Sequence, residues 1–208
     1  MQIRSRSRSR DPTFYLHMAS PRLSTWPEVE TAIKDNRKEL IIKGPFERDN
    51  DDGVPRDDQT LPDELFDVTQ LNTLQVSMTR LSLVPVRISN LSSLISLRLF
   101  NNQITLIPLE IGRLVNLKHL DLSHNELSNI PDEIGDLKVL ESLNLAHNKL
   151  SQLPNKCNAL PKLALIDISF NEFTEFPVEL LTESHSNLST VIAQHNQIAS
   201  LSGMYVRG

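Results

Sequence analysis

A chain of 208 residues, 39% of them hydrophobic, is long enough to bury a continuous core. Its formal net charge is −5, and its only cysteine, Cys157, is expected to be a buried small hydrophobe. No apolar run approaches the length that spans a membrane, and the absence of a cysteine-rich cap favours a reducing compartment. We therefore expect a cytoplasmic protein, with a nuclear location as the alternative.

Residues 1–22 are basic, with five arginines against one aspartate, and residues 4–10 alternate arginine with serine. Such a run is typical of a disordered, solvated tail. It also resembles a short arginine–serine tract, so RNA contact through residues 1–17 is one interpretation. The other is a basic tail without a defined role, or untranslated upstream sequence with Met18 as the start.

Residues 23–45 are interpreted as an N-terminal cap helix and a first strand. Thr25 and Glu28 fit a capping box, with a proline inside the first turn of the helix. Apolar residues then follow at helical spacing and define one face. These are Trp26, Val29, Ile33 and Leu40, with Ala32 beside them. Residues 39–43 are expected to form a short strand, and the acidic residues 46–60 to form a solvated loop.

Asparagine then recurs at intervals of 23, 23, 23 and 25 residues. The positions are Asn102, Asn125, Asn148, Asn171 and Asn196. Residues 117–137 give the unit as LxxLxLxxNxLxxIPxxIGxL, the pattern of a leucine-rich repeat. The carboxamide can donate to and accept from backbone groups where the chain leaves the strand, so the stacked copies are expected to form a structural asparagine ladder. Thr79 replaces the asparagine in the first copy.

This pattern predicts an α/β fold, a right-handed leucine-rich-repeat solenoid with about six copies over residues 61–201. Parallel strands should line the concave face, and short helical or 3-10 segments the convex face. Residues 202–208 are an uncapped tail. Because terminal copies need a polar cap, we expect a fragment or isoform of a longer protein whose last copy is poorly packed.

Alternate strand residues are expected on the concave face in three columns. The third column comprises Ser77, Phe100, Ser123, Ala146, Ser169 and Gln194. Most column residues are small and polar, which predicts a shallow surface, and Phe100 can either anchor a partner or pack against its neighbours. The candidate partner-binding residues are Arg98, Phe100, His119, Asp121, Asn144 and Asp167.

Histidines suggest a metal hypothesis that the pattern does not support. His124, His147 and His195 share one column, but Phe170 interrupts it, and we assign no metal. No phosphate-binding loop, HExxH, CxxC or GxSxG motif is present, so we predict no catalytic residue and no cofactor.

Two resemblances extend this interpretation. The LPxxIGxL-like spacing over residues 61–201 resembles the 23-residue repeat class of Ras-pathway scaffolds and plant intracellular Ras-group-related proteins. The segments beginning at Met18, Trp26, Arg37 and Leu61 resemble the opening of the leucine-rich repeat-containing protein 47 family. That resemblance implies a link to RNA or translation, through a linker and a domain similar to the phenylalanyl-tRNA synthetase β subunit that this sequence lacks.

We therefore predict a non-catalytic protein–protein interaction module, a scaffold or adaptor that binds a protein partner on its concave face. The alternative, implied by the resemblance, is an RNA-associated or translation-linked protein. Neither a membrane nor a small-molecule substrate is expected.

Overall fold

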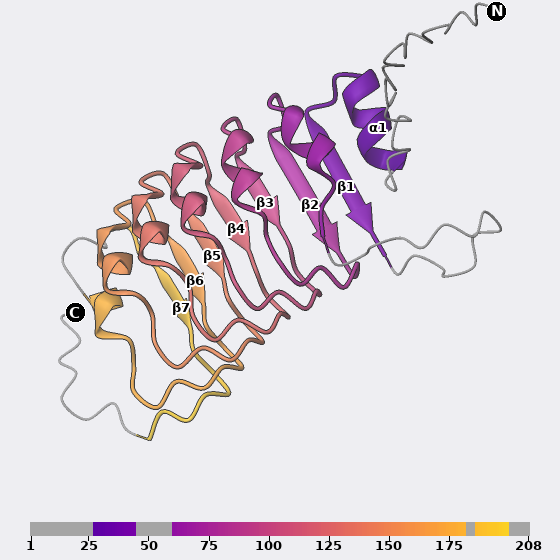
Figure 1. Cartoon of the computed structure of the whole chain (residues 1–208). Coiled ribbons are helices and arrows are strands. Elements are labelled where there is room, and N and C mark those ends of the chain that lie inside the picture. Colours follow the sequence, from indigo (N-terminus) through magenta and orange to yellow (C-terminus); the bar gives the residue numbers. More distant parts are fainter. Residues whose placement is uncertain (1–26, 45–59, 182–185, 200–208) are drawn as a thin grey trace, which may run out of the picture.

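The computed structural model describes residues 27–44, 60–181 and 186–199. The predicted tail, the capping-box residue Thr25, Trp26, the acidic loop except Thr60, and residues 202–208 lie outside the described residues. In the described part, seven parallel strands form one sheet in sequence order, β1 to β7 (Figure 1). The strands are β1 (Glu39–Lys43), β2 (Thr73–Ser77), β3 (Ser96–Arg98), β4 (His119–Asp121), β5 (Ser142–Asn144), β6 (Leu165–Asp167) and β7 (Thr190–Ile192).

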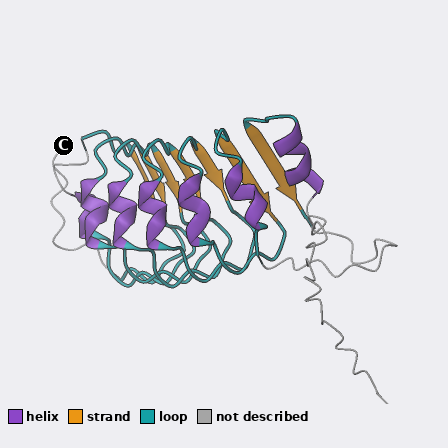
Figure 2. Cartoon of the chain, turned by 45° about the horizontal axis from the view of Figure 1, so that its top comes forward, coloured by secondary structure: helices purple, strands orange, loops and turns teal. Residues whose placement is uncertain are grey.

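Short 3-10 segments return the chain from the end of each strand to the start of the next. They are η1 (Asp63–Asp67), η2 (Val86–Asn90), η3 (Leu109–Arg113), η4 (Asp132–Asp136), η5 (Asn155–Ala159) and η6 (Val178–Leu181). These segments stand in a row opposite the sheet (Figure 2). The architecture is the leucine-rich-repeat solenoid expected from the asparagine and leucine spacing.

The strand register follows the leucine columns predicted from the sequence. Leu97 pairs with Leu120, which pairs in turn with Leu143. All three side chains are at most 1% exposed. Each copy therefore buries its inward side chains against its neighbours, because a single copy cannot enclose them. Phe66 and Phe173 are the largest of the fully buried side chains.

The predicted asparagine ladder is present with repeating geometry. Nδ2 of Asn125 donates to the carbonyl of Leu99 in the preceding copy at 2.9 Å and to that of Leu122 at 3.0 Å. Its Oδ1 accepts the Ile104 N–H at 3.0 Å. Where threonine replaces asparagine, the Thr79 hydroxyl donates to Oδ1 of Asn102. The ladder thus satisfies buried backbone groups that the turn would leave unpaired.

The cap helix is shorter than the apolar spacing suggested, and its buried face is different. The helix α1 (Pro27–Lys34) buries Val29 and Ala32, whereas Ile33 is 46% exposed and Leu40 lies in β1. Asn36 ends the helix in the left-handed region, with φ of 51°. The Arg37 N–H then donates to the Ala32 carbonyl, which completes a Schellman-type cap.

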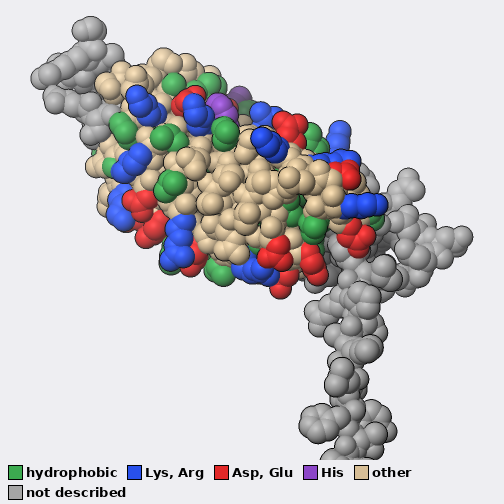
Figure 3. Space-filling view, turned by 90° about the horizontal axis from the view of Figure 1, so that it is seen from above, with side chains coloured by type: hydrophobic (Ala, Val, Ile, Leu, Met, Phe, Trp, Pro, Cys, Tyr) green, Lys and Arg blue, Asp and Glu red, His purple; other side chains and the backbone are tan. Residues whose placement is uncertain are grey.

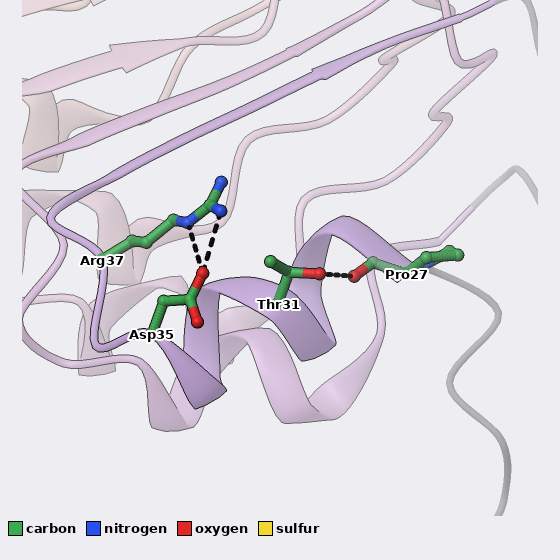
Figure 4. A network of polar contacts seen from close by, with 4 residues as sticks. All are labelled: Pro27, Thr31, Asp35 and Arg37. Atoms are coloured by element: carbon green, nitrogen blue, oxygen red, sulfur yellow. Dashed lines mark hydrogen bonds and ion pairs between the residues drawn. The ribbon is translucent and has the colours of Figure 1, made fainter.

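Side-chain contacts reinforce both ends of α1 (Figure 4). The Thr31 hydroxyl donates to the Pro27 carbonyl at 2.8 Å, and Arg37 pairs with Asp35 at 2.9 Å. No helix within the described residues has the length and apolarity needed to cross a membrane.

The last described copy is packed less completely than the others. Val191 aligns with Ile166 in the sheet, yet it is only half-buried, whereas Ile166 is fully buried. Leu188, Ala193 and Ile198 are also partly buried against the core. Leu201 lies outside the described residues.

Candidate partner-binding face

The outward side chains of the strands form a regular surface, which we call the strand face and which corresponds to the predicted concave face. The sheet register aligns its residues in two columns. The first contains Glu39, Thr73, Ser96, His119, Ser142, Leu165 and Thr190. The second contains Ile41, Gln75, Arg98, Asp121, Asn144, Asp167 and Ile192.

The third predicted column is mostly buried and does not widen this face. Ser77, Ser123, Ala146 and Ser169 are at most 6% exposed, and Phe100 is half-buried. The residue after each of these has a positive φ, so the column lies where the chain bends out of the strand. The prediction of an exposed third column is wrong for its four buried members, because strand alternation does not extend through that bend, whereas Gln194 in the last copy is exposed.

Asp121 and Asp167 hold the end of their own strands. Oδ1 of Asp121 accepts the Ser123 N–H at 3.1 Å and the Ser123 hydroxyl at 2.7 Å. Oδ1 of Asp167 accepts the corresponding bonds from Ser169 at 2.9 and 2.6 Å. Asn144 accepts the Ala146 N–H in the same way at 3.1 Å. These three side chains are therefore held in place before any partner arrives.

Arg98 and His119 are exposed and lie on neighbouring strands, two positions apart in the register. Neither side chain makes a hydrogen bond or ion pair with the described residues, so both side chains are available to a partner. Ile41, 57% exposed in the second column, is a residue that the candidate set missed. The sequence signal that could have found it was the expected strand over residues 39–43, because Ile41 alternates with Leu40 and Ile42 and so faces the opposite side of the sheet.

A stack of aromatic rings runs beside the strand face. We call His124, His147, Phe170 and His195 the ring ladder. Successive ring centroids are 4.0, 4.0 and 4.1 Å apart, and the planes deviate from parallel by 13°, 11° and 20°. All four residues have φ between 53° and 56°, as does Asn101 in the same column at 55°. Phe170 therefore continues the histidine column as a stack, although it cannot ligate a metal.

The middle histidine is electrostatically perturbed. Desolvation lowers the pKa of His147, and the nearby His124 lowers it further, whereas Asp167 raises it. Parallel rings direct their in-plane nitrogen lone pairs side by side rather than toward a shared ion. Among the described residues, no group of three or more histidine, cysteine or acidic side chains is placed to hold a metal.

Comparison with known proteins identifies the class. Residues 107–201 match the family described as a leucine-rich repeat region, and residues 93–114 match the leucine rich repeat family. Residues 93–201 therefore contain leucine-rich repeats, and the described strands form a leucine-rich-repeat solenoid. A comparison with curated protein sequences finds no match.

Similar solved structures include bacterial and plant proteins. A leucine-rich repeat protein of Leptospira interrogans is 33% identical with a TM-score of 0.63, over 65% of this chain and 34% of that one. A plant peptide hormone receptor, RGFR1, solved in complex with RGF2, is 32% identical with a TM-score of 0.57, over 62% and 21%. An internalin of Listeria monocytogenes is 25% identical with a TM-score of 0.57, over 68% and 42%. The chain thus spans less than half the length of each.

Proposed function

We propose that the chain is a non-catalytic protein-interaction module, a scaffold or adaptor, that binds a partner protein on the strand face. The observation that carries this proposal is that exposed side chains project from a sheet whose strands are held in fixed register. Ile41 and Arg98 stand free in the second column, on strands locked in register with their neighbours. Solenoids use such extended surfaces for binding.

Pre-arranged polar groups support the same proposal. Asp121, Asn144 and Asp167 are fixed by bonds to their own strand ends through Oδ1, and these bonds do not engage Oδ2 of the aspartates or Nδ2 of Asn144. Groups that are ordered before binding lose little conformational entropy when a partner docks. The plant receptor solved in complex with RGF2 is a relative by fold whose solved form includes a bound partner.

The test compares two double variants in affinity purification from cells that express the chain. Ile41→Ala with Arg98→Ala removes an exposed aliphatic and an arginine from the strand face. Val178→Ala with Arg113→Ala removes the same side-chain types from the 3-10 segments, where Val178 is 64% exposed. We expect the first pair to lose specific partners and the second to retain them. Partners retained equally by both variants would refute strand-face binding.

The RNA-associated role remains an alternative proposal, supported by the resemblance to the leucine-rich repeat-containing protein 47 family. Its physical basis is the net charge of residues 1–22, five arginines against one aspartate, whereas the remaining residues carry 16 basic and 25 acidic side chains. Acidic and basic side chains are interspersed on the face seen in Figure 3, which does not favour phosphate binding there. Deletion of residues 1–17 should abolish salt-sensitive RNA crosslinking. Equal crosslinking with and without them excludes this role.

A further inference from the structure

Phe170 carries two unfavourable features at once. Its backbone is left-handed, with φ of 53°, and its side chain is 42% exposed. A bulky residue rarely adopts that backbone, and an exposed ring gains little from burial. Stacking on His147 and His195 offsets part of this cost. A strained, exposed aromatic residue is a reason to look for a role in binding.

Carboxylates flank the ring ladder on both sides. The second strand-face column lies three positions before the ladder residues in sequence, and it contains Asp121 and Asp167. Two positions after them lies a further column, with Glu126 and Glu172. Lys149 is the only basic side chain in these two columns between residues 121 and 197, and it pairs with Glu126 at 3.0 Å. The surroundings of the ladder are therefore acidic.

Basic residues lie instead in the copies before the ladder. Arg98 lies in the second strand-face column, and Arg80 lies in the column that follows the ladder. Both belong to the copies at the N-terminal side of His124, near Asn101. His119, in the first column on β4, is the histidine of the strand face. The charge on this surface thus changes sign along the solenoid, from basic at β3 to acidic from β4 onward.

We propose that the ring ladder and its flanking carboxylates bind a cationic, lysine- or arginine-bearing segment of the partner protein, and release it when the ladder histidines are protonated. This inference rests on the proposed function and specifies its partner chemistry. The argument for the occupant is charge complementarity, which steers and orients association. Phe170 and the neutral imidazoles supply apolar contact for the aliphatic stems, and the carboxylates pair with the charged heads.

Protonation opposes this binding for a direct reason. Each imidazolium would add a positive charge about 4 Å from the next ring, beside the cationic segment. Imidazolium rings at the spacing of His124 and His147 repel one another, and each also repels a cationic side chain placed beside it. Three imidazolium charges would then neutralise the net charge of the four flanking carboxylates and Lys149.

The first test measures binding of a short alternating lysine–glycine peptide to the full chain at low ionic strength, by fluorescence anisotropy. Asp121→Asn with Asp167→Asn removes both charges but keeps the strand-end acceptor, because Asn144 already makes that bond at 3.1 Å. The control, Asp132→Asn with Asp136→Asn, makes the same charge change on η4. We expect roughly tenfold weaker binding for the first pair and no change for the control.

Three outcomes would overturn the inference. One is equal binding of a matched glutamate–glycine peptide, and another is an equal loss of affinity in the control pair. The third is a peptide-free dimer in sedimentation that dissociates on Asp121→Asn with Asp167→Asn, because a second copy would then occupy the surface. If the peptide results fail while the Ile41 and Arg98 variant still loses partners, the proposed function stands without this inference.

The second test addresses release. His124→Asn, His147→Asn and His195→Asn together remove the titratable rings, and Asn101 shows that asparagine fits this column at φ of 55°. We expect the lysine peptide to bind roughly tenfold more weakly at about pH 5.5 than at about pH 7.5 in the unaltered chain. The triple variant should show no such difference. The same pH dependence in both proteins would overturn the role of the ladder.

Discussion

Asn148 and Leu127 belong to successive copies, and the carboxamide Oδ1 of Asn148 accepts the buried Leu127 N–H at 3.0 Å. Nδ2 of Asn148 also donates to the Leu122 carbonyl at 3.0 Å. One side chain therefore connects the backbones of two copies at the point where both leave the sheet.

Replacement of Asn148 by alanine should lower the free energy of unfolding by about 3 kcal/mol, because buried backbone groups lose their partners. Urea titration measures the change. Asn196→Ala provides the comparison, since Asn196 makes the equivalent bonds in partly buried surroundings and should cost less. Equal losses would contradict a dependence on burial.

Gly112 is required by the close approach of successive 3-10 segments. A Cβ atom there would lie 2.6 Å from the Glu133 carbonyl oxygen, which is backbone of the next copy. Gly112→Ala should therefore destabilise the protein by about 2 kcal/mol through steric overlap. Ser89 occupies the same position one copy earlier, so Ser89→Ala should change stability by less than about 0.5 kcal/mol. Thermal unfolding of both variants distinguishes the two effects.

Cys157 should be inert in the folded protein. Burial raises the pKa of its thiol to about 12, with further contributions from Glu179 and Asp132. Thiolate, the reactive form, is therefore scarce at neutral pH, and reagents cannot reach the sulfur. We expect labelling by a chromogenic disulfide only as fast as the solenoid opens, with rapid reaction in denaturant. Immediate labelling of the native chain would disprove this burial.

His147 should make stability depend on pH. Its folded-state pKa is lowered from the ordinary value of 6.5, mainly by desolvation, so below that value the unfolded chain binds more protons than the folded one. The stabilising contribution is complete above pH 6.5 and is lost as the pH falls through the folded-state pKa. His147→Asn should reduce the change of the urea unfolding midpoint with pH in this range. If the variant and the unaltered chain showed the same pH dependence of stability, groups other than His147 would be its cause.

Hydrogen exchange should report the incomplete packing of the last copy. Amide protection is expected to fall from the copy of Asn148 to that of Asn196, because Val191 is only half-buried where Ile166 is fully buried. Mass spectrometry of peptides covering β5 and β7 measures this directly. Equal protection of the two strands would contradict it.

The repeat pattern predicted the register because leucine spacing determines which strand residue faces inward. It did not predict the end of α1, where Leu40 continued the helical spacing although the chain had already turned at Asn36. A left-handed asparagine is a local signal, and periodicity over a longer window conceals it.

The ring ladder was only half visible in the sequence. The sequence predicts one column of His124, His147 and His195 that Phe170 interrupts, because a shared metal requires a nitrogen ligand at every position. Stacking requires only a flat ring, and the uniform φ of the turn brings successive rings to about 4 Å. The single-copy pattern contains no information on that contact between copies.

Each copy adds one strand, so positions on the strand face are graduated in steps of about 4.8 Å. Asp121 and Asp167 lie two strands apart, and Asn144 lies on the strand between them. Insertion of one whole copy between Asn125 and Asn148 would lengthen that interval by one step, while Asp167 would keep both neighbouring strands and Asp121 would keep β3 on one side. The distance between two charged side chains on the strand face is therefore set by the number of copies between them. A partner with fixed charge spacing would depend on that number rather than on the identity of any one copy.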